Sequence, residues 1–125
     1  MDDRFEQMRA KRKAAAEALL KKEKVEEAED VWDFFETLGF MVRRKAVDEE
    51  LVWHTFFHWR DGYWNASRTH IAAYQATYPT AYVDFKNLHE QTLAIERGKL
   101  EKTGRNYQIY PVEKFLKEEA ELEED

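Results

Sequence analysis

Two groups of polar side chains in the segment from residue 48 to residue 77 have the types and spacing that chemistry requires. If this segment is a helix, with about 100° between successive residues, Glu50, His54, His58 and Asp61 share one narrow polar strip. Two histidines four residues apart can both bind a transition metal, and an acidic residue one turn away can be a third ligand. The strip lacks the internal glutamate of a zinc protease helix. A solvent-exposed helix face is therefore the favoured interpretation, with His54, His58 and Glu50 as weak metal candidates.

The second group, Arg60, Ser67 and His70, falls on the aromatic side of the same segment. A guanidinium cannot lose its charge, so its burial requires a carboxylate partner or stacking on aromatic rings. A lone histidine on an apolar face, such as His89 in the next segment, is more often a satisfied core residue than a catalytic one. We therefore expect a buried arginine that needs an acidic partner.

Glu36 is the best-placed acid for Arg60, because it borders the apolar side of the preceding helical segment. The sequence thus predicts an Arg60–Glu36 ion pair, with Asp33 as the fallback partner. The pair would be either a structural clamp or the floor of a small polar pocket that includes His70 and Tyr74. A clamp is the favoured reading, since a buried ion pair by itself is weak evidence for function.

The elements that must position these residues are helices. Hydrophobic periodicity predicts breaks near residues 25, 46 and 79, with Asp48 as an N-cap and Pro79 ending the long aromatic helix. A short helix is expected after Pro111, and the preceding residues 105–110 have no helical period. The expected helices cover 3–24, 25–45, 48–77 and 80–103. This pattern predicts an all-α, antiparallel up-down bundle of about four helices plus a short C-terminal helix. We expect a single domain over residues 1–125, with a basic lead helix (3–24), an aromatic helical core (25–104) and an acidic C-terminal helix (111–124).

Composition excludes several classes of protein. The 125 residues include only four glycines and two prolines, too few turn-forming residues for an all-β fold with many strands. The absence of cysteine excludes a disulfide framework, a zinc–thiolate site and a thiol nucleophile. We expect no cofactor, no transmembrane segment and a cytoplasmic location, because no apolar stretch approaches the length of a signal sequence core or a spanning helix.

Charge is distributed unevenly along the chain. Residues 1–24 carry eight basic and five acidic groups, whereas residues 111–125 carry two basic and seven acidic groups. The basic end could contact nucleic acid or an anionic membrane, but its acids are interleaved with its bases and the whole chain has a net charge of −6. Nucleic acid and membrane surfaces are therefore disfavoured as partners.

Four stretches resemble one known family when they are read together: WDFFETLGFMVRR, DEELVWHTFFHWRDGYW, TYPTAYVDFKNL and EKFLKEEAEL. The strongest parts are Phe34-Phe35-Glu36 through Arg43-Arg44, then Asp48-Glu49-Glu50-Leu51, then Tyr63-Trp64. The family is the uncharacterised bacterial domain of unknown function 4760. The resemblance implies a small helical bacterial protein with no assigned reaction. Many members carry an N-terminal transmembrane helix, from which this chain departs.

Fourteen of the eighteen aromatic residues lie between Trp32 and Phe85. If packing within the chain cannot cover them all, the remainder forms an interface, with Trp53, Trp59 and Trp64 as candidate anchors. The leading hypothesis is therefore a non-catalytic helical protein-interaction module that binds a protein partner or forms a homodimer. The alternative is a small-ligand or metal binder that uses Glu36, Arg60 and His70 or the His54–His58 strip.

Overall fold

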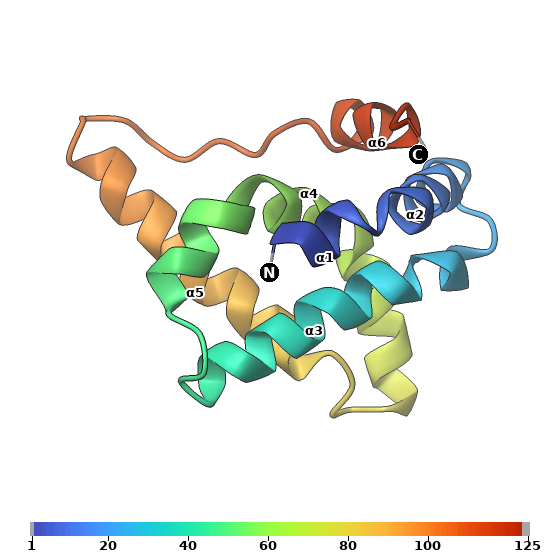
Figure 1. The fold of residues 1–125 in the computed structure, drawn as a ribbon, viewed down its shortest axis with the longest axis horizontal. Coiled ribbons are helices and arrows are strands. Elements are labelled where there is room, and N and C mark those ends of the chain that lie inside the picture. The colour runs from blue at the N-terminus through green and yellow to red at the C-terminus, as the bar shows by residue number, and fades with distance from the viewer. Residues whose placement is uncertain (1, 124–125) are drawn as a thin grey trace.

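The structure, a computed structural model, describes the backbone of residues 2–123 and the side chains of residues 4–123. Within this range the fold is all-α and contains no strand, which confirms the predicted fold class (Figure 1). The elements are α1 (Asp2–Glu6), α2 (Arg9–Lys21), the 3-10 helix η1 (Val25–Ala28), α3 (Glu29–Arg43), α4 (Glu49–Thr77), α5 (Val83–Glu101) and α6 (Val112–Ala120). None of the helices in the described range is long and apolar enough to span a bilayer.

Helix α4 is the long aromatic helix that the periodicity predicted. The Asp48 carboxylate caps its first turn by accepting a hydrogen bond from the Leu51 amide, at 3.1 Å. The helix ends at Thr77 because a residue that precedes a proline, here Tyr78, is disfavoured in the α conformation. Both boundaries therefore follow from local chemistry.

The first segment is not the continuous helix expected over residues 3–24. The chain turns at Met8, between α1 and α2, and the side chain of Phe5 enters the core. Its ring lies against Phe34, Phe56 and other aromatic rings, and the guanidinium of Arg12 stacks on it at 4.1 Å. Aromatic packing by tertiary neighbours thus outweighs the good helix propensity of this segment.

The predicted break near residue 25 is confirmed, although no glycine or proline marks it. Lys22 and Lys24 both adopt the left-handed conformation, with φ angles of 56° and 52°. Lys22 ends α2, and η1 then leads into α3.

Helix α5 is the central packing partner of the fold. It makes extensive contacts with both α3 and α4, whereas direct contact between α3 and α4 is sparse. A Cβ atom at Gly39 would collide with the backbone carbonyl of Asp84, so a side chain there would force α3 and α5 apart. An up-down bundle implies that α3 and α4, which are consecutive, pack directly against each other; here α5 takes that place instead.

Residues of α3 hold the N-terminus of α5. Tyr82 precedes α5 in the left-handed conformation and cannot cap it with its own side chain. The Glu36 carboxylate instead accepts a hydrogen bond from the Phe85 amide at 2.7 Å, and Arg43 donates to Asp84 at 2.8 Å. A cap supplied by another helix satisfies an amide that would otherwise lack a partner.

The chain returns across the molecule through residues 102–111, which we call the strap (Figure 1). The strap leads to α6, which packs against α2 and α4. Gly62 allows this contact, because a Cβ atom at that position would overlap the ring of Phe115. The predicted extended stretch before Pro111 and the helix after it are both confirmed.

Candidate functional site

Arg60 lies fully buried between α4 and α5, as the phase of α4 predicted. Its Nε donates to the Thr92 hydroxyl at 2.8 Å, and its Nη1 donates to Asp61 at 3.2 Å and to Nδ1 of His89. The guanidinium also lies 5.0 Å from the centre of the Phe57 ring. The burial lowers the pKa of Arg60 to about 10, and the adjacent Asp61 opposes that decrease.

The predicted Arg60–Glu36 ion pair is wrong, and so is the fallback with Asp33. Because α5 lies over Arg60, the acids of α3 face other groups. Glu36 caps α5, and burial raises the pKa of its carboxyl group, while Asp33 accepts a hydrogen bond from the Tyr82 hydroxyl at 3.0 Å. The acid that does pair with Arg60 is its own neighbour, Asp61.

The wider pocket expected around Arg60 is not formed either. Ten residues separate His70 from Arg60, which at 1.5 Å per residue is about 15 Å along the helix axis. Tyr74 lies a turn further, is 43% exposed and contacts Tyr78 and Tyr82. Ser67, the third polar residue on this face, accepts a hydrogen bond from the Trp32 indole at 2.7 Å.

The polar strip of α4 is only partly as expected. Glu50, His54 and His58 are exposed, and Glu50 pairs with Lys99 at 2.8 Å. Asp61 is buried, contrary to the prediction, because the strap covers this end of the strip. No three His, Asp or Glu side chains converge into a metal-binding group in the part of the chain that the structure describes.

The three tryptophans proposed as interface anchors are occupied within the chain. Trp64 is buried against Phe85 and His89, so it offers no accessible surface and that assignment is wrong. Trp53 is half-buried, and its indole donates to Glu96 at 2.9 Å. Trp59 is half-buried and packs on Phe5.

A hydrogen bond between side chains fastens the strap to α4. The Tyr107 hydroxyl donates to the Asp61 carboxylate at 2.6 Å, on the oxygen that Arg60 does not use. Burial and the hydrogen bond to Asp61 raise the pKa of Tyr107 to about 12. Asp61 therefore joins a buried arginine to the strap.

His89 is a satisfied core histidine, as expected. Its ring stacks on Trp64 with the centroids 5.1 Å apart and accepts the hydrogen bond from Arg60, which requires an unprotonated Nδ1. The pKa of His89 falls to about 3, because burial disfavours the charged ring and because Arg60, Arg68 and Arg97 surround it with positive charge.

This environment predicts a sensitivity to acid. In the unfolded chain His89 binds a proton near its ordinary pKa of 6.5, whereas in the folded chain it binds one only near pH 3. The unfolded state therefore binds more protons between these two pH values, and the free energy of unfolding falls as the pH is lowered from 6.5 toward 3. Because the ring is partly solvated, we expect a loss of about 1–2 kcal/mol rather than the full value of the shift. His89→Gln should lose less stability than the wild type between pH 6.5 and 4, measured by urea unfolding. His54→Gln, at an exposed position, is the control and should follow the wild type.

A pocket of about 580 Å³ opens beside this cluster, between α4, α5 and the strap. We call it the strap pocket and define it by Phe57, His58, Asp61, Glu96, Arg105 and Tyr107. The sequence analysis did not bring these residues together. It assigned His58 and Asp61 to an exposed strip, and it assigned Glu96, Arg105 and Tyr107 to no site. One signal was present: Asp61 follows Phe57 by four residues, which places it beside the aromatic face rather than opposite to it.

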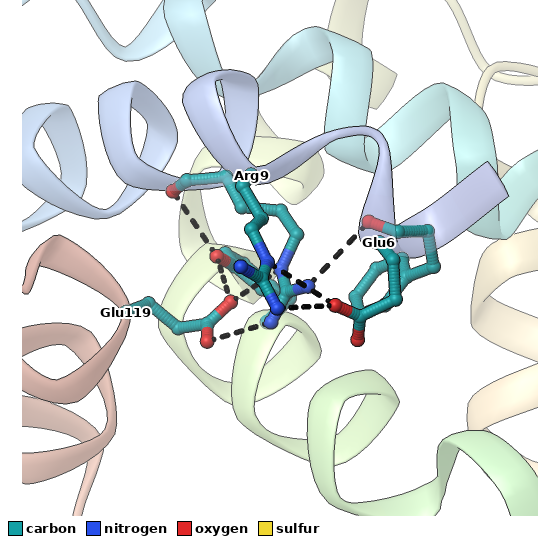
Figure 2. A network of polar contacts seen from close by, with 6 residues as sticks. Glu6, Arg9 and Glu119 are labelled. Carbon is teal, nitrogen blue, oxygen red and sulfur yellow. Dashed lines mark hydrogen bonds and ion pairs between the residues drawn. The ribbon is translucent and has the colours of Figure 1, made fainter. Parts of the chain in front are cut away.

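A second buried cluster joins α2, α4 and α6 (Figure 2). Arg12 makes a bidentate ion pair with Glu119, with both N···O distances at 2.9 Å, and the Tyr63 hydroxyl donates to the same carboxylate at 2.7 Å. Burial and the Glu119 carboxylate raise the pKa of Tyr63. The spacing of the sequence already indicated that Arg12 is buried, because Arg12 lies on the same apolar helix face as Phe5, Met8 and Ala15. The sequence analysis did not use this.

A second hollow, of about 800 Å³, lies between α2 and α3. Met8, Phe34 and Met41 supply its apolar lining, and Lys11 and Asp33 supply charge. Asp33 connects this hollow to Tyr82 through its hydrogen bond. One residue of the hollow is therefore bonded to Tyr82, which precedes α5.

Comparison with known proteins gives a family but no activity. No curated protein and no solved structure matches the chain significantly. The model of one family, described as domain of unknown function (DUF4760), matches residues 1–92, which include α1 to α4 and the half of α5 that carries His89 and Thr92. Because the match covers most of the chain, and agrees with the resemblance in the sequence, this protein belongs to the DUF4760 family.

Proposed function

We propose that this protein is a non-catalytic helical interaction module that associates with a second copy of itself. The observation that carries the proposal is a cluster of Tyr74, Tyr78 and Tyr82 at the turn between α4 and α5, which we call the tyrosine surface. The Tyr74 ring lies 4.9 Å from Tyr78 and 5.9 Å from Tyr82, while Tyr74 and Tyr78 are 43% and 55% exposed. Tyrosine is enriched at protein interfaces, where its ring buries apolar area and its hydroxyl can still form a hydrogen bond.

The tyrosine surface is held in place by the fold beneath it. Tyr82 stays in the left-handed conformation, which is costly for a bulky residue, and its hydroxyl donates to Asp33 while its ring lies edge-on to Trp32. Tyr74 thus packs on an anchored ring, and Tyr78 packs on Tyr74. A rigid aromatic cluster loses little conformational entropy when a partner covers it.

A second copy of the chain is the partner that we propose for this surface. A standard interface buries roughly 800 Å² on each partner. A twofold contact between two tyrosine surfaces would use one self-complementary patch and would close as a dimer.

Sedimentation velocity over a range of protein concentrations tests the proposal. We expect a monomer–dimer equilibrium in the wild type, and a dissociation constant raised by about tenfold or more in the double variant Tyr74→Ser/Tyr78→Ser. Leu51→Ser is the matched control, because Leu51 is also exposed and apolar but lies at the other end of α4. A strict monomer at all concentrations, or a dimer that the double variant does not weaken, contradicts the proposal.

The cytoplasmic location and the absence of nucleic acid from the partners remain predictions from the sequence. Fractionation of cells that express the full chain tests the location. Binding of DNA or RNA at low salt, with an affinity that falls as salt is added, would contradict the second prediction.

A further inference from the structure

We propose that the strap pocket is a binding site for a small organic acid, with a carboxylate group and a flat apolar body. This inference is independent of the proposed self-association, because the tyrosine surface lies at the opposite end of α4 from the residues that line the pocket. It rests on an imbalance between hydrogen-bond donors and acceptors around the pocket.

The carboxylates of the pocket already have partners within the chain. Asp61 accepts hydrogen bonds from Arg60 and Tyr107, one on each oxygen, and Glu96 accepts one from the Trp53 indole. Two arginine side chains at or next to the pocket, by contrast, have N–H donors that are not used by these carboxylates. Nη2 of the buried Arg60 has no hydrogen-bond partner among the described residues, and Arg105 is an exposed residue of the pocket lining.

Arg60 does not itself line the pocket, but it contacts two residues that do. Its guanidinium is 5.0 Å from the Phe57 ring centre and hydrogen-bonded to Asp61, and both of these residues line the pocket. A buried donor without an acceptor is costly, and a native structure normally supplies a partner for it. An acceptor that entered between Phe57 and Asp61 would satisfy this donor.

The surrounding charge favours an acid over an amine. Asp61 is already paired with Arg60, which leaves Glu96 as the one carboxylate without an ion pair in the described lining, against Arg105 in the lining and Arg97 beside Tyr107. The ring faces that could hold an organic cation are already in use, because Arg60 lies over Phe57 and Arg97 lies 5.6 Å from the centre of Tyr107. An arginine fork binds a carboxylate in a bidentate geometry, which gives Arg105 its role at the open side of the pocket.

The apolar part of the lining sets the shape of the ligand. Phe57 and Tyr107 lie edge to face with centroids 6.4 Å apart, and Leu100 and the ring of His58 complete this side. A flat aromatic body packs well against ring edges such as these. Benzoate therefore serves as the probe, because it combines one carboxylate with one ring.

The test is a titration of the full chain, labelled with nitrogen-15, with benzoate, followed by amide chemical shifts and by calorimetry. Benzamide has the same shape without the charge, and benzylamine has the opposite charge. We expect benzoate to shift the amides of residues 57–61 and 105–108 and to bind at least about tenfold more tightly than benzamide or benzylamine.

Arg105→Gln is the decisive variant, because Arg105 is exposed and its replacement leaves the buried cluster intact. We expect it to weaken benzoate binding by about tenfold, while Arg44→Gln, an exposed arginine at the end of α3, leaves the affinity unchanged. Equal binding of benzoate and benzamide, shifts confined to other regions, no binding, or an unchanged affinity in Arg105→Gln would each overturn the proposal. Repeating the titration with Tyr74→Ser/Tyr78→Ser, in which benzoate should bind as in the wild type, separates this outcome from the outcome for self-association.

Discussion

Replacing Glu119 with leucine should lower the free energy of unfolding by about 3–5 kcal/mol, because it leaves the Arg12 charge buried without its partner. The side chains of Arg12 and Glu119 are 2% and 6% exposed, so water cannot substitute for the missing carboxylate. The Phe5 and Trp59 rings that flank the guanidinium attract the cation, but they accept no conventional hydrogen bond. The Tyr63 hydroxyl also loses the closer of its two acceptors and keeps only the Arg12 carbonyl at 3.2 Å. Urea denaturation of each variant measures the loss.

The double variant Arg12→Met/Glu119→Leu distinguishes a stranded charge from a simple loss of packing. Removing both members of a buried pair is often nearly neutral, so the double variant should be more stable than Glu119→Leu alone. Glu121→Gln is the matched control, since Glu121 is exposed in the turn after α6. A loss below about 1 kcal/mol in Glu119→Leu, or additive losses in the double variant, would show that this cluster does not fasten α6 to α2.

The second large effect is expected for Asp61→Leu, at about 3 kcal/mol or more. This change removes the carboxylate that is bonded to the fully buried Arg60 in the described part of the chain, and it also releases Tyr107 of the strap. Thr92 and His89 remain as neutral acceptors and do not offset the charge. Urea denaturation measures the loss in free energy, and hydrogen exchange of residues 105–110 should become faster if the strap is released.

Arg60→Met is the informative comparison for Asp61→Leu. It leaves a carboxylate that lines an open pocket and that keeps the Tyr107 hydroxyl as a donor, so we expect a smaller loss than for Asp61→Leu. Tyr107→Phe removes only the bond to the strap and should cost about 1 kcal/mol. If Asp61→Leu were no more destabilising than Tyr107→Phe, the Asp61 charge would not be compensating Arg60.

Local chemistry was sufficient to predict the helices. The Asp48 cap, the proline after Tyr78 and a continuous aromatic face predicted the 29 residues of α4, and Pro111 predicted the start of α6. These features act over a few residues, so a sequence displays them directly. The turn at Met8 was not predictable in this way, because the aromatic rings that draw Phe5 into the core come from α3 and α4.

The sequence by itself determined that Arg60 is buried, because the phase of α4 places it among aromatic residues, and burial of a permanent charge implies a partner. Only the tertiary structure decided which partner. Helix α5, rather than α3, covers Arg60, so Glu36 became the cap of α5 and Asp61, Thr92 and His89 surround the guanidinium. The choice depends on the close approach of α3 and α5 at Gly39 and on the return of the strap over α4. Both are contacts between residues more than forty positions apart. Hydrophobic periodicity indicates which face of a helix is apolar, but it does not indicate which other element packs against that face.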